Sequence, residues 1–143
     1  MLPGTNQSGP QWWTHRRLYL NNDKVKVLIV DDFEAGAQAL SDYLSLEDMD
    51  CRTAYDGAEA LITSAAWAPH IILMDIAMPV LDGIGAARTL RLHAKTKHTV
   101  IVAFTALQAE EVQQRLVGHE FDGYCHKGRT TDALVSFILS AIL

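Results

Sequence analysis

The feature that most constrains this chain is an apolar run that ends on a carboxylate. Residues 71–74 read Ile-Ile-Leu-Met, which suits a strand buried on both faces of a sheet, and Asp75 follows directly. Pro79 and the pair Asp82-Gly83 supply turn chemistry a few residues later. Because a charge at the end of a buried strand costs free energy unless it is used, we interpret Asp75 as a nucleophile that accepts a phosphoryl group.

Helical patterns alternate with strand-like segments along the rest of the chain. Besides the central run, the sequence predicts strands at residues 25–30, 50–54, 99–104 and 121–126. It predicts a helix opened by Gly83 and further helices at residues 34–46, 58–66, 107–117 and 130–143. Five strands that alternate with five helices are typical of an α/β fold with a doubly wound parallel sheet.

Apolar residues recur at helical spacing in two of these segments. In the second helix they are Ala58, Leu61, Ile62, Ala65 and Ala66. In the last helix the predicted inward stripe is Leu134, Phe137, Ile138, Ala141 and Ile142. Its other sides carry further apolar residues, namely Val135, Leu139 and Leu143. A surface helix normally shows a polar face there, so we expect this helix to pair with a partner or with a second copy of the domain.

Reactive side chains follow four of the predicted strands. They are Asp31 with Asp32, Asp75, Thr105 and Lys127. Ligands of doubly wound sheets bind at the carboxyl ends of the strands, so we expect these five side chains to meet at one edge. Lys127 offers a positive charge and Thr105 a hydroxyl donor for phosphoryl oxygens. Attack by Asp75 on a phosphoryl donor would give an acyl phosphate.

Three carboxylates at one edge repel one another, and a hard cation relieves that repulsion. Mg²⁺ prefers oxygen ligands and is often bound together with a phosphate. The carboxylate candidates are Asp31, Asp32 and Asp75, and the backbone carbonyl of Ala77 is a further candidate ligand. Each residue alone has a simpler interpretation as a turn, a helix cap or a solvated side chain. Because these residues all follow predicted strands, we favour one shared binding site over these separate interpretations.

These segments together resemble the response-regulator receiver domain, over about residues 24–143. The motifs that carry the resemblance are Val-Leu-Ile-Val-Asp-Asp, Ile-Leu-Met-Asp-Ile-Ala-Met-Pro with Asp-Gly, Val-Ala-Phe-Thr-Ala and Tyr-Cys-His-Lys. The resemblance implies a flavodoxin-like (βα)5 fold with a five-stranded parallel sheet in the order 2-1-3-4-5. It also implies the roles of the site residues: Asp75 as the phosphoacceptor, Thr105 and Lys127 as its hydroxyl and lysine, and Mg²⁺ held by Asp31, Asp32, Asp75 and the Ala77 carbonyl.

The same resemblance implies a switch and its partners. Tyr124 matches the aromatic residue that moves inward when the threonine, here Thr105, moves toward the phosphoryl group. The implied donor is a phosphohistidine on a sensor histidine kinase or a histidine phosphotransfer protein of a two-component system or phosphorelay. The implied output is a changed surface for a downstream protein target, so we expect a signalling module and not an enzyme with turnover.

Three positions depart from the family pattern. Gly128 follows Lys127 where the family usually has proline, which bears on how the lysine is presented. Ala77 and Leu107 are apolar at two positions that flank the phosphoryl site and often tune hydrolysis in this family. Because neither side chain can orient a water through a polar group, we predict a slowly hydrolysed phosphoryl group.

Two alternatives stay open at this point. The first is a receiver-fold scaffold that binds partners without phosphorylation. The second is a Mg²⁺-dependent phosphohydrolase that works through an aspartyl phosphate. A small-molecule phosphodonor separates the three: the switch accumulates label at Asp75, the scaffold takes none, and the hydrolase releases phosphate catalytically.

Composition narrows the class of protein further. The formal net charge of −5 argues against nonspecific nucleic-acid binding by the whole surface. No apolar run approaches the roughly 20 residues of a membrane helix, and the start lacks the pattern of a signal peptide. Cys51 and Cys125 form no CxxC pair, so we interpret them as reduced core residues of a cytoplasmic protein. Arg88 and Arg91 are interpreted as part of a solvated helix face.

The start of the chain differs from the rest. We predict a flexible N-terminal extension at residues 1–22 and a receiver domain at residues 23–143. Within the extension lie several large apolar residues, namely Trp12, Trp13, Leu18, Tyr19 and Leu20. The favoured interpretation is a short arm that packs its aromatic side chains on the domain. The alternative is a docking segment for a partner.

Overall fold

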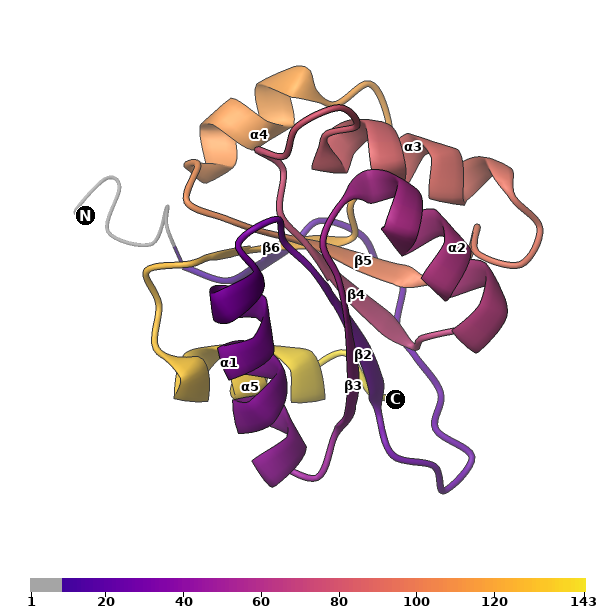
Figure 1. The fold of residues 1–143 in the computed structure, drawn as a ribbon, viewed down its shortest axis with the longest axis vertical. Coiled ribbons are helices and arrows are strands. Elements are labelled where there is room, and N and C mark those ends of the chain that lie inside the picture. The colour runs from indigo at the N-terminus through magenta and orange to yellow at the C-terminus, as the bar shows by residue number, and fades with distance from the viewer. Residues whose placement is uncertain (1–8) are drawn as a thin grey trace.

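A computed structural model of the chain describes residues 9–143 (Figure 1). The strands are β1 (Gln11–Trp12), β2 (Lys26–Val30), β3 (Asp50–Ala54), β4 (Ile71–Met74), β5 (Val100–Thr105) and β6 (Gly123–His126). The helices are α1 (Glu34–Leu46), α2 (Gly57–Trp67), α3 (Gly83–Leu92), α4 (Ala109–Arg115) and α5 (Thr131–Leu139). In this part of the chain no helix has both the length and the apolar character needed to cross a bilayer.

The strands form one six-stranded sheet in the order β1-β6-β5-β4-β2-β3. Strands β2 to β6 are mutually parallel, and their neighbours are those expected from the order 2-1-3-4-5. The expectation of five strands, all parallel, is wrong because β1 adds a sixth strand that pairs antiparallel with β6. β1 has two residues, too few to produce a strand-like periodicity, and its position depends on an open edge elsewhere in the fold.

Helices cover both faces of the sheet (Figure 1). Alternate residues of each strand point to opposite faces, so β2 sends Leu28 toward α2, α3 and α4 and Ile29 toward α1 and α5. All four residues of β4 are fully buried, which explains why the central run is continuously apolar. The side-chain oxygens of Asp56, Asp82 and Thr130 cap α2, α3 and α5 by accepting backbone N–H groups.

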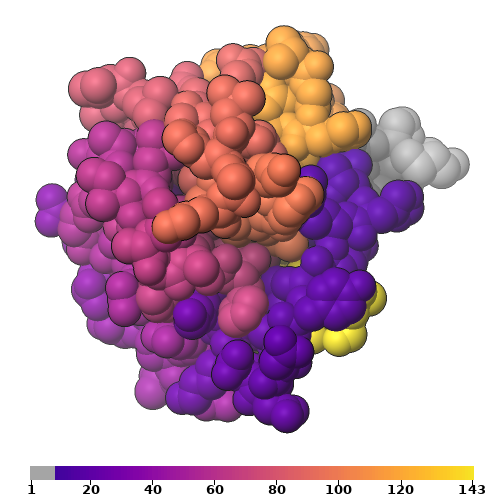
Figure 2. Space-filling view, turned by 90° about the vertical axis from the view of Figure 1, so that its right-hand side faces the viewer, coloured from indigo at the N-terminus to yellow at the C-terminus, as the bar shows by residue number. Residues whose placement is uncertain are grey.

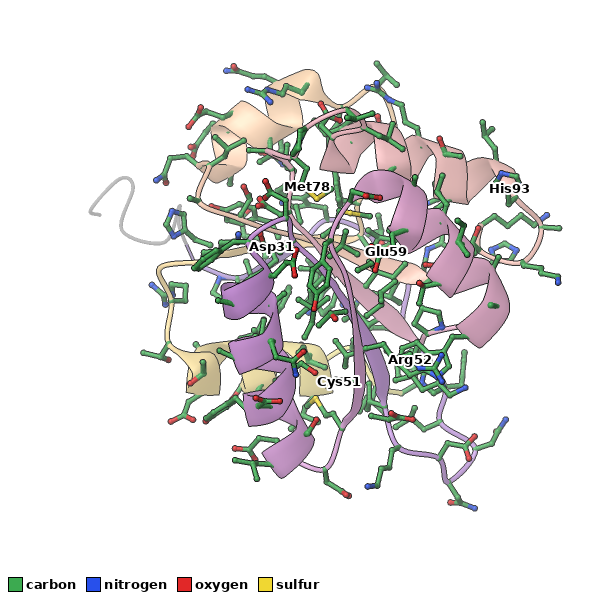
Figure 3. All side chains as sticks on the ribbon, in the orientation of Figure 1. Asp31, Cys51, Arg52, Glu59, Met78 and His93 are labelled. Carbon is green, nitrogen blue, oxygen red and sulfur yellow. The ribbon has the colours of Figure 1, made fainter. Side chains whose placement is uncertain are left out.

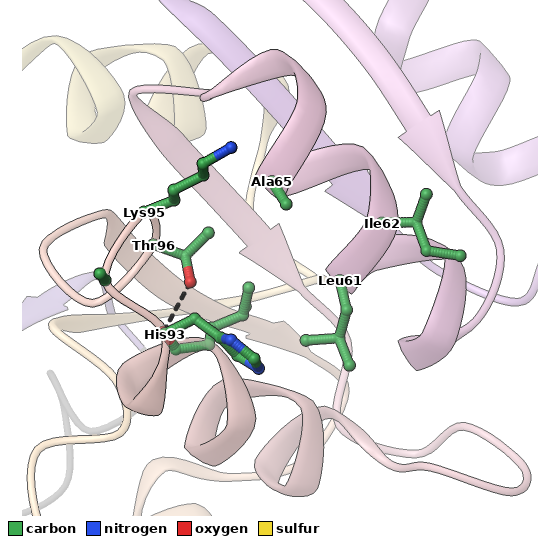
Figure 4. A pocket seen from close by; sticks show the side chains of 8 residues that line it. Leu61, Ile62, Ala65, His93, Lys95 and Thr96 are labelled. Atoms are coloured by element: carbon green, nitrogen blue, oxygen red, sulfur yellow. Dashed lines mark hydrogen bonds between the residues drawn. The ribbon is translucent and has the colours of Figure 1, made fainter.

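The apolar residues noted at helical spacing in α2 are not the ones that it buries. The residues that α2 buries are Gly57, Ala60, Ser64 and Trp67. Ile62 is 72% exposed, and Leu61, Ile62 and Ala65 line a groove of about 500 Å³ between α2 and the loop after α3 (Figure 4). Apolar residues occur on almost every side of this helix, and the side that carries Ala60 and Trp67 is the one that packs on the sheet.

The C-terminal helix ends four residues earlier than predicted, at Leu139. Leu18 of the N-terminal segment forms a parallel bridge with Ile142. The Leu18 N–H donates to the Ala141 carbonyl at 2.9 Å, and the Leu143 N–H donates to the Leu18 carbonyl at 3.0 Å. The last residues therefore leave the helix to pair with a segment from the start of the chain.

Residues 11–20, which we call the N-terminal arm, pack against the domain. Trp12 stacks on Phe137 of α5 with 4.2 Å between ring centroids, and Leu18 is buried. Figure 2 shows the arm in indigo beside the orange segment near residue 98 and the yellow C-terminus, and Arg16 bonds to His98 at 3.2 Å. This packing differs from a flexible extension over residues 1–22 and agrees with the packed-arm interpretation. Residues 1–8 lie outside the described part, and the domain boundary after residue 22 stays a prediction.

A buried carboxylate ties the arm to the sheet. Asp122, directly before β6, is fully buried, and its carboxylate accepts bonds from Arg16 at 3.0 Å, Arg91 at 2.6 Å, the Thr14 hydroxyl at 2.8 Å and the Ile101 N–H at 2.9 Å. The interpretation as a solvated helix face is therefore wrong for Arg91, whereas Arg88 is exposed as expected. Arg91 pairs with Asp122, and Arg88 pairs with Glu120 at 3.0 Å.

Candidate functional site

Four of the five predicted strand-end residues meet at the carboxyl edge of the sheet, namely Asp31, Asp32, Asp75 and Lys127. Asp75 follows β4 and is 7% exposed. Its backbone N–H donates to the Val30 carbonyl at 2.9 Å, and its side-chain Oδ1 accepts the Ile76 N–H at 2.8 Å. These bonds hold the Asp75 carboxylate at the end of the central strand, with its second oxygen available to other groups.

Gly83 is a site-shaping residue that sequence reasoning treated only as a turn and helix start. A side chain there would place its Cβ 2.0 Å from the Asp75 carbonyl oxygen, a contact that no residue other than glycine avoids. The Gly83 N–H also donates to the Ile76 carbonyl at 3.0 Å. The Asp-Gly pair after the central strand therefore lets the start of α3 approach the backbone carbonyl of Asp75.

Asp31 and Asp32 follow β2 and complete an acidic cluster with Asp75. One carboxylate oxygen from each of the three residues lies within 4.8 Å of the others. Asp31 is 7% exposed and its Oδ1 accepts the Phe33 N–H at 3.0 Å, whereas Asp32 is exposed. Figure 3 labels Asp31 just before the start of α1, and Met78 belongs to the loop that follows the central strand. This donor set of three hard oxygens fits the preference of Mg²⁺.

Lys127 bridges two members of the acidic cluster. Its Nζ donates to Asp31 Oδ2 at 2.5 Å and to Asp75 Oδ2 at 3.0 Å. Burial lowers the pKa of the Lys127 ammonium, but the hydrogen bonds to Asp31 and Asp75 and the negative charges of these two residues together outweigh that effect, so the pKa lies above its ordinary value. The lysine is therefore charged at neutral pH and compensates part of the negative charge of the cluster.

Gly128 takes part in the presentation of Lys127. Its backbone N–H donates to His126 Nδ1 at 2.8 Å, a bond that proline cannot make. His126 Nε2 lies 3.0 Å from the Ala106 carbonyl, and the Lys127 N–H donates to the Thr105 carbonyl at 2.9 Å. The segment after β6 is thus tied to the end of β5, and Lys127 reaches the carboxylates without the usual proline.

Thr105 and Tyr124 are joined through Leu107. The Leu107 N–H donates to Thr105 Oγ1 at 3.3 Å, and the Tyr124 hydroxyl donates to the Leu107 carbonyl at 2.8 Å. Both Thr105 and Tyr124 are buried. Burial raises the pKa of Tyr124 to about 12, so its hydroxyl keeps its proton and stays a donor at neutral pH.

Ala77 and the two cysteines complete the set of residues singled out from the sequence. Ala77 is exposed in the loop two residues beyond Asp75, and the role of its carbonyl as a metal ligand stays a prediction. Cys51 and Cys125 are free thiols. Burial raises the pKa of each to about 11, so both remain protonated at neutral pH.

Comparisons with known sequences agree on one family. The family model described as the response regulator receiver domain matches residues 27–139. The response regulator PleD of Caulobacter vibrioides is 40% identical over 82 residues, 57% of this chain and 18% of that protein. The sensor histidine kinase RcsC of Salmonella typhi is 34% identical over 114 residues, 80% of this chain and 12% of that protein. The chain thus spans less than a fifth of the length of these two curated relatives.

Solved structures show the same fold. The chemotaxis protein CheY4 of Vibrio cholerae superposes with a TM-score of 0.75 at 28% identity, covering 82% of this chain and 98% of that one. The response regulator TrrA of Thermotoga maritima, solved in complex with Mg²⁺ and BeF, gives a TM-score of 0.72 at 27% identity, covering 81% of this chain and 97% of that one. With the acidic cluster, the bridging lysine and the family model over residues 27–139, the chain belongs to the response regulator receiver domain family.

Proposed function

We propose that the chain is a phosphorylation-activated signalling switch. Asp75 accepts a phosphoryl group from a phosphohistidine on a sensor histidine kinase or a histidine phosphotransfer protein, and a downstream protein reads the change. The observation that carries this proposal is the bridge from Lys127 to Asp31 and Asp75 within the three-carboxylate cluster. Family membership supports it, because receiver domains of two-component systems interact with such kinases and with downstream targets.

The transfer step needs positioning and charge neutralisation more than covalent chemistry from other residues. An oxygen of the Asp75 carboxylate attacks phosphorus, an acyl phosphate O–P bond forms, the P–N bond of the donor breaks, and the electron pair returns to the donor imidazole. Asp31, Asp32, Asp75 and the Ala77 carbonyl would hold Mg²⁺, which when bound neutralises charge on the phosphoryl oxygens. The Lys127 ammonium would stabilise the same oxygens by its positive charge.

Phosphorylation changes the contacts of two residues at the edge. Lys127 exchanges part of its bond with Asp75 for the phosphoryl oxygens, and the Thr105 hydroxyl turns toward them. Because Thr105 is linked through Leu107 to Tyr124, such a movement favours one arrangement of the loop between β5 and α4. We therefore expect a shift between two populations of this loop, with Thr105 and Tyr124 as its switch residues.

The test is incubation of the whole chain with acetyl phosphate and Mg²⁺. The switch takes up one stable, hydroxylamine-labile phosphoryl group at Asp75. A scaffold that works without phosphorylation takes up none, and a phosphohydrolase releases inorganic phosphate in many turnovers. Mass spectrometry of the intact protein, together with a phosphate-release assay, distinguishes the three outcomes.

Replacing Lys127 by glutamine is expected to slow phosphoryl incorporation about 10²-fold, the usual cost of removing one donor from developing charge. The rate is measured by quenched time courses with acetyl phosphate. Lys24→Gln is the matched control, because Lys24 pairs with Asp48 on the exposed surface, where such pairs contribute little. Equal rates for the two variants would contradict the role of Lys127.

The phosphoryl group is expected to persist for much longer than seconds once free donor and Mg²⁺ are removed. The physical reason is that Ala77 and Leu107 bring no polar side chain that could orient a water toward phosphorus. The lifetime is read from the decay of the labelled mass, and Ala77→Asn should shorten it. Loss of label from the wild-type chain within seconds, with no phosphatase present, would show that another group positions the water.

We propose that α5 supports self-association through apolar residues outside its core stripe. Leu139 at the end of the helix is 49% exposed, and Leu143, four residues beyond the helix, is 70% exposed. The arm already covers Phe137 of this helix through Trp12, so Phe137 is not part of the proposed surface. Sedimentation at high concentration, with and without Mg²⁺ and BeF₃⁻ as a phosphoryl mimic, should show a dimer that Leu139→Asp abolishes. Monomer under both conditions would rule this pairing out.

A further inference from the structure

The N-terminal arm lies against the residue proposed as the switch. β1 pairs with β6 so that Gln11 is opposite Tyr124 and Trp12 is opposite Gly123. The next residue, Trp13, stacks on Tyr124 with 5.6 Å between ring centroids and 15° between ring planes. The Trp13 indole thus covers one face of the Tyr124 ring, and the Tyr124 hydroxyl donates to the Leu107 carbonyl. These two contacts hold the Tyr124 side chain in place.

The arm is built to stay close to β6. The Trp13 N–H donates to the Asp122 carbonyl at 2.7 Å, and the Trp13 indole donates to the Gln11 amide oxygen at 2.9 Å. A side chain at Gly123 would place its Cβ 2.8 Å from the Trp12 ring, so the absence of a side chain there permits the close approach of β1. The backbone bond to Asp122 and the indole bond to Gln11 therefore both help to hold Trp13 against Tyr124.

We propose that Trp13 is a positioning residue for Tyr124, and that the docked arm sets how tightly the domain holds a phosphoryl group. This inference rests on the proposed function of Asp75, Thr105 and Tyr124. The docked indole occupies one side of the tyrosine and favours its buried position. It thereby preorganises the hydrogen-bonded chain from Tyr124 through Leu107 to Thr105 before any phosphoryl group arrives.

Thermodynamic linkage gives the direction of the effect. If a phosphoryl group favours the buried tyrosine, then the buried tyrosine favours the phosphoryl group by the same factor. Removing the Trp13 ring lowers the fraction of molecules that have Tyr124 in its buried position. The apparent dissociation constant for the phosphoryl mimic varies inversely with that fraction, so it rises. An aromatic pair of this kind contributes enough for a change of about 2- to 10-fold.

The experiment is a titration of the whole chain with BeF₃⁻ at saturating Mg²⁺, as a double-mutant cycle on Trp13 and Tyr124. Trp13→Ala should weaken BeF₃⁻ binding about 2- to 10-fold, and Trp13→Phe should restore most of the affinity. In the Tyr124→Ala background, Trp13→Ala should have no effect on BeF₃⁻ binding. Gly123→Ala displaces β1 but keeps both aromatic rings, and it should also weaken BeF₃⁻ binding. This variant replaces Trp13→Ala in the test if Trp13→Ala does not fold.

Three other results would overturn the proposal in distinguishable ways. Equal BeF₃⁻ affinities for wild type, Trp13→Ala and Gly123→Ala would show that the arm does not act on the site. An equal loss in the wild-type and Tyr124→Ala backgrounds would assign Trp13 a structural role only. Failure of the folded wild-type chain to bind BeF₃⁻ would overturn the proposed function itself, and the positioning role of Trp13 with it.

Discussion

Asp75→Asn is expected to abolish phosphoryl incorporation from acetyl phosphate while leaving the chain folded. The substitution removes the nucleophilic carboxylate oxygen but keeps a side chain of the same shape, whose Oδ1 can still accept the Ile76 N–H. The amide lowers the repulsion within a cluster of three negative charges but loses the bond from Lys127 to Asp75 Oδ2, so we expect only a small net change in the free energy of unfolding. The mass of the intact protein after incubation measures the result.

Asp56→Asn is the matched control for this variant. Asp56 caps α2 by accepting the Glu59 N–H at 2.7 Å, and asparagine caps helices about as well. The control should therefore incorporate phosphoryl groups at the wild-type rate. Label on Asp75→Asn that matches the wild-type amount would place the acceptor at another residue and would end the proposal as stated.

Asp122→Ala is expected to lower the free energy of unfolding by about 3–5 kcal/mol, the usual cost of breaking a buried ion pair from one side. The carboxylate is fully buried and joins Arg16 of the arm, Arg91 of α3 and the Ile101 N–H of β5. Removing it leaves two guanidinium groups unpaired and one backbone donor unsatisfied. Urea unfolding with linear extrapolation measures the change.

Two variants test whether the burial of Asp122 is the cause. Asp48→Ala removes an exposed carboxylate that pairs with Lys24, and it should change the free energy of unfolding by less than about 1 kcal/mol. Asp122→Asn keeps the shape and part of the hydrogen bonding, so it should fall between the control and Asp122→Ala. A loss of stability in Asp122→Ala no larger than that in Asp48→Ala would mean that the arm and α3 are held by other contacts.

Local chemistry explains why much of the fold was predictable. The central run of residues 71–74 is buried on both faces, and that demands apolar residues at every position. The caps at Asp56 and Asp82 bond to N–H groups three residues along the chain, so their pattern is visible without tertiary contacts. The five parallel strands followed from the alternation of such segments.

Other features depended on surfaces that form only in the fold. The arm pairs Gln11 with Tyr124, more than a hundred residues away, and two residues of strand carry no periodic signal. The buried face of α2, which carries Trp67, depended on packing against the sheet because apolar residues surround that helix. The short final helix reflects competition between another helical turn and pairing with Leu18.

The amino-acid order alone determined the strand-end positions of Asp31, Asp32, Asp75, Thr105 and Lys127, because each lies at a boundary set by neighbours in the chain. Only the tertiary structure decided which groups lie in contact with these residues. It placed Lys127 on Asp31 and Asp75, the start of α3 against the Asp75 carbonyl, and Trp13 on Tyr124. The physical reason is the separation along the chain. Helix caps and strand patterns involve residues that are near neighbours in the sequence, whereas these contacts join distant segments that come together only when the sheet forms.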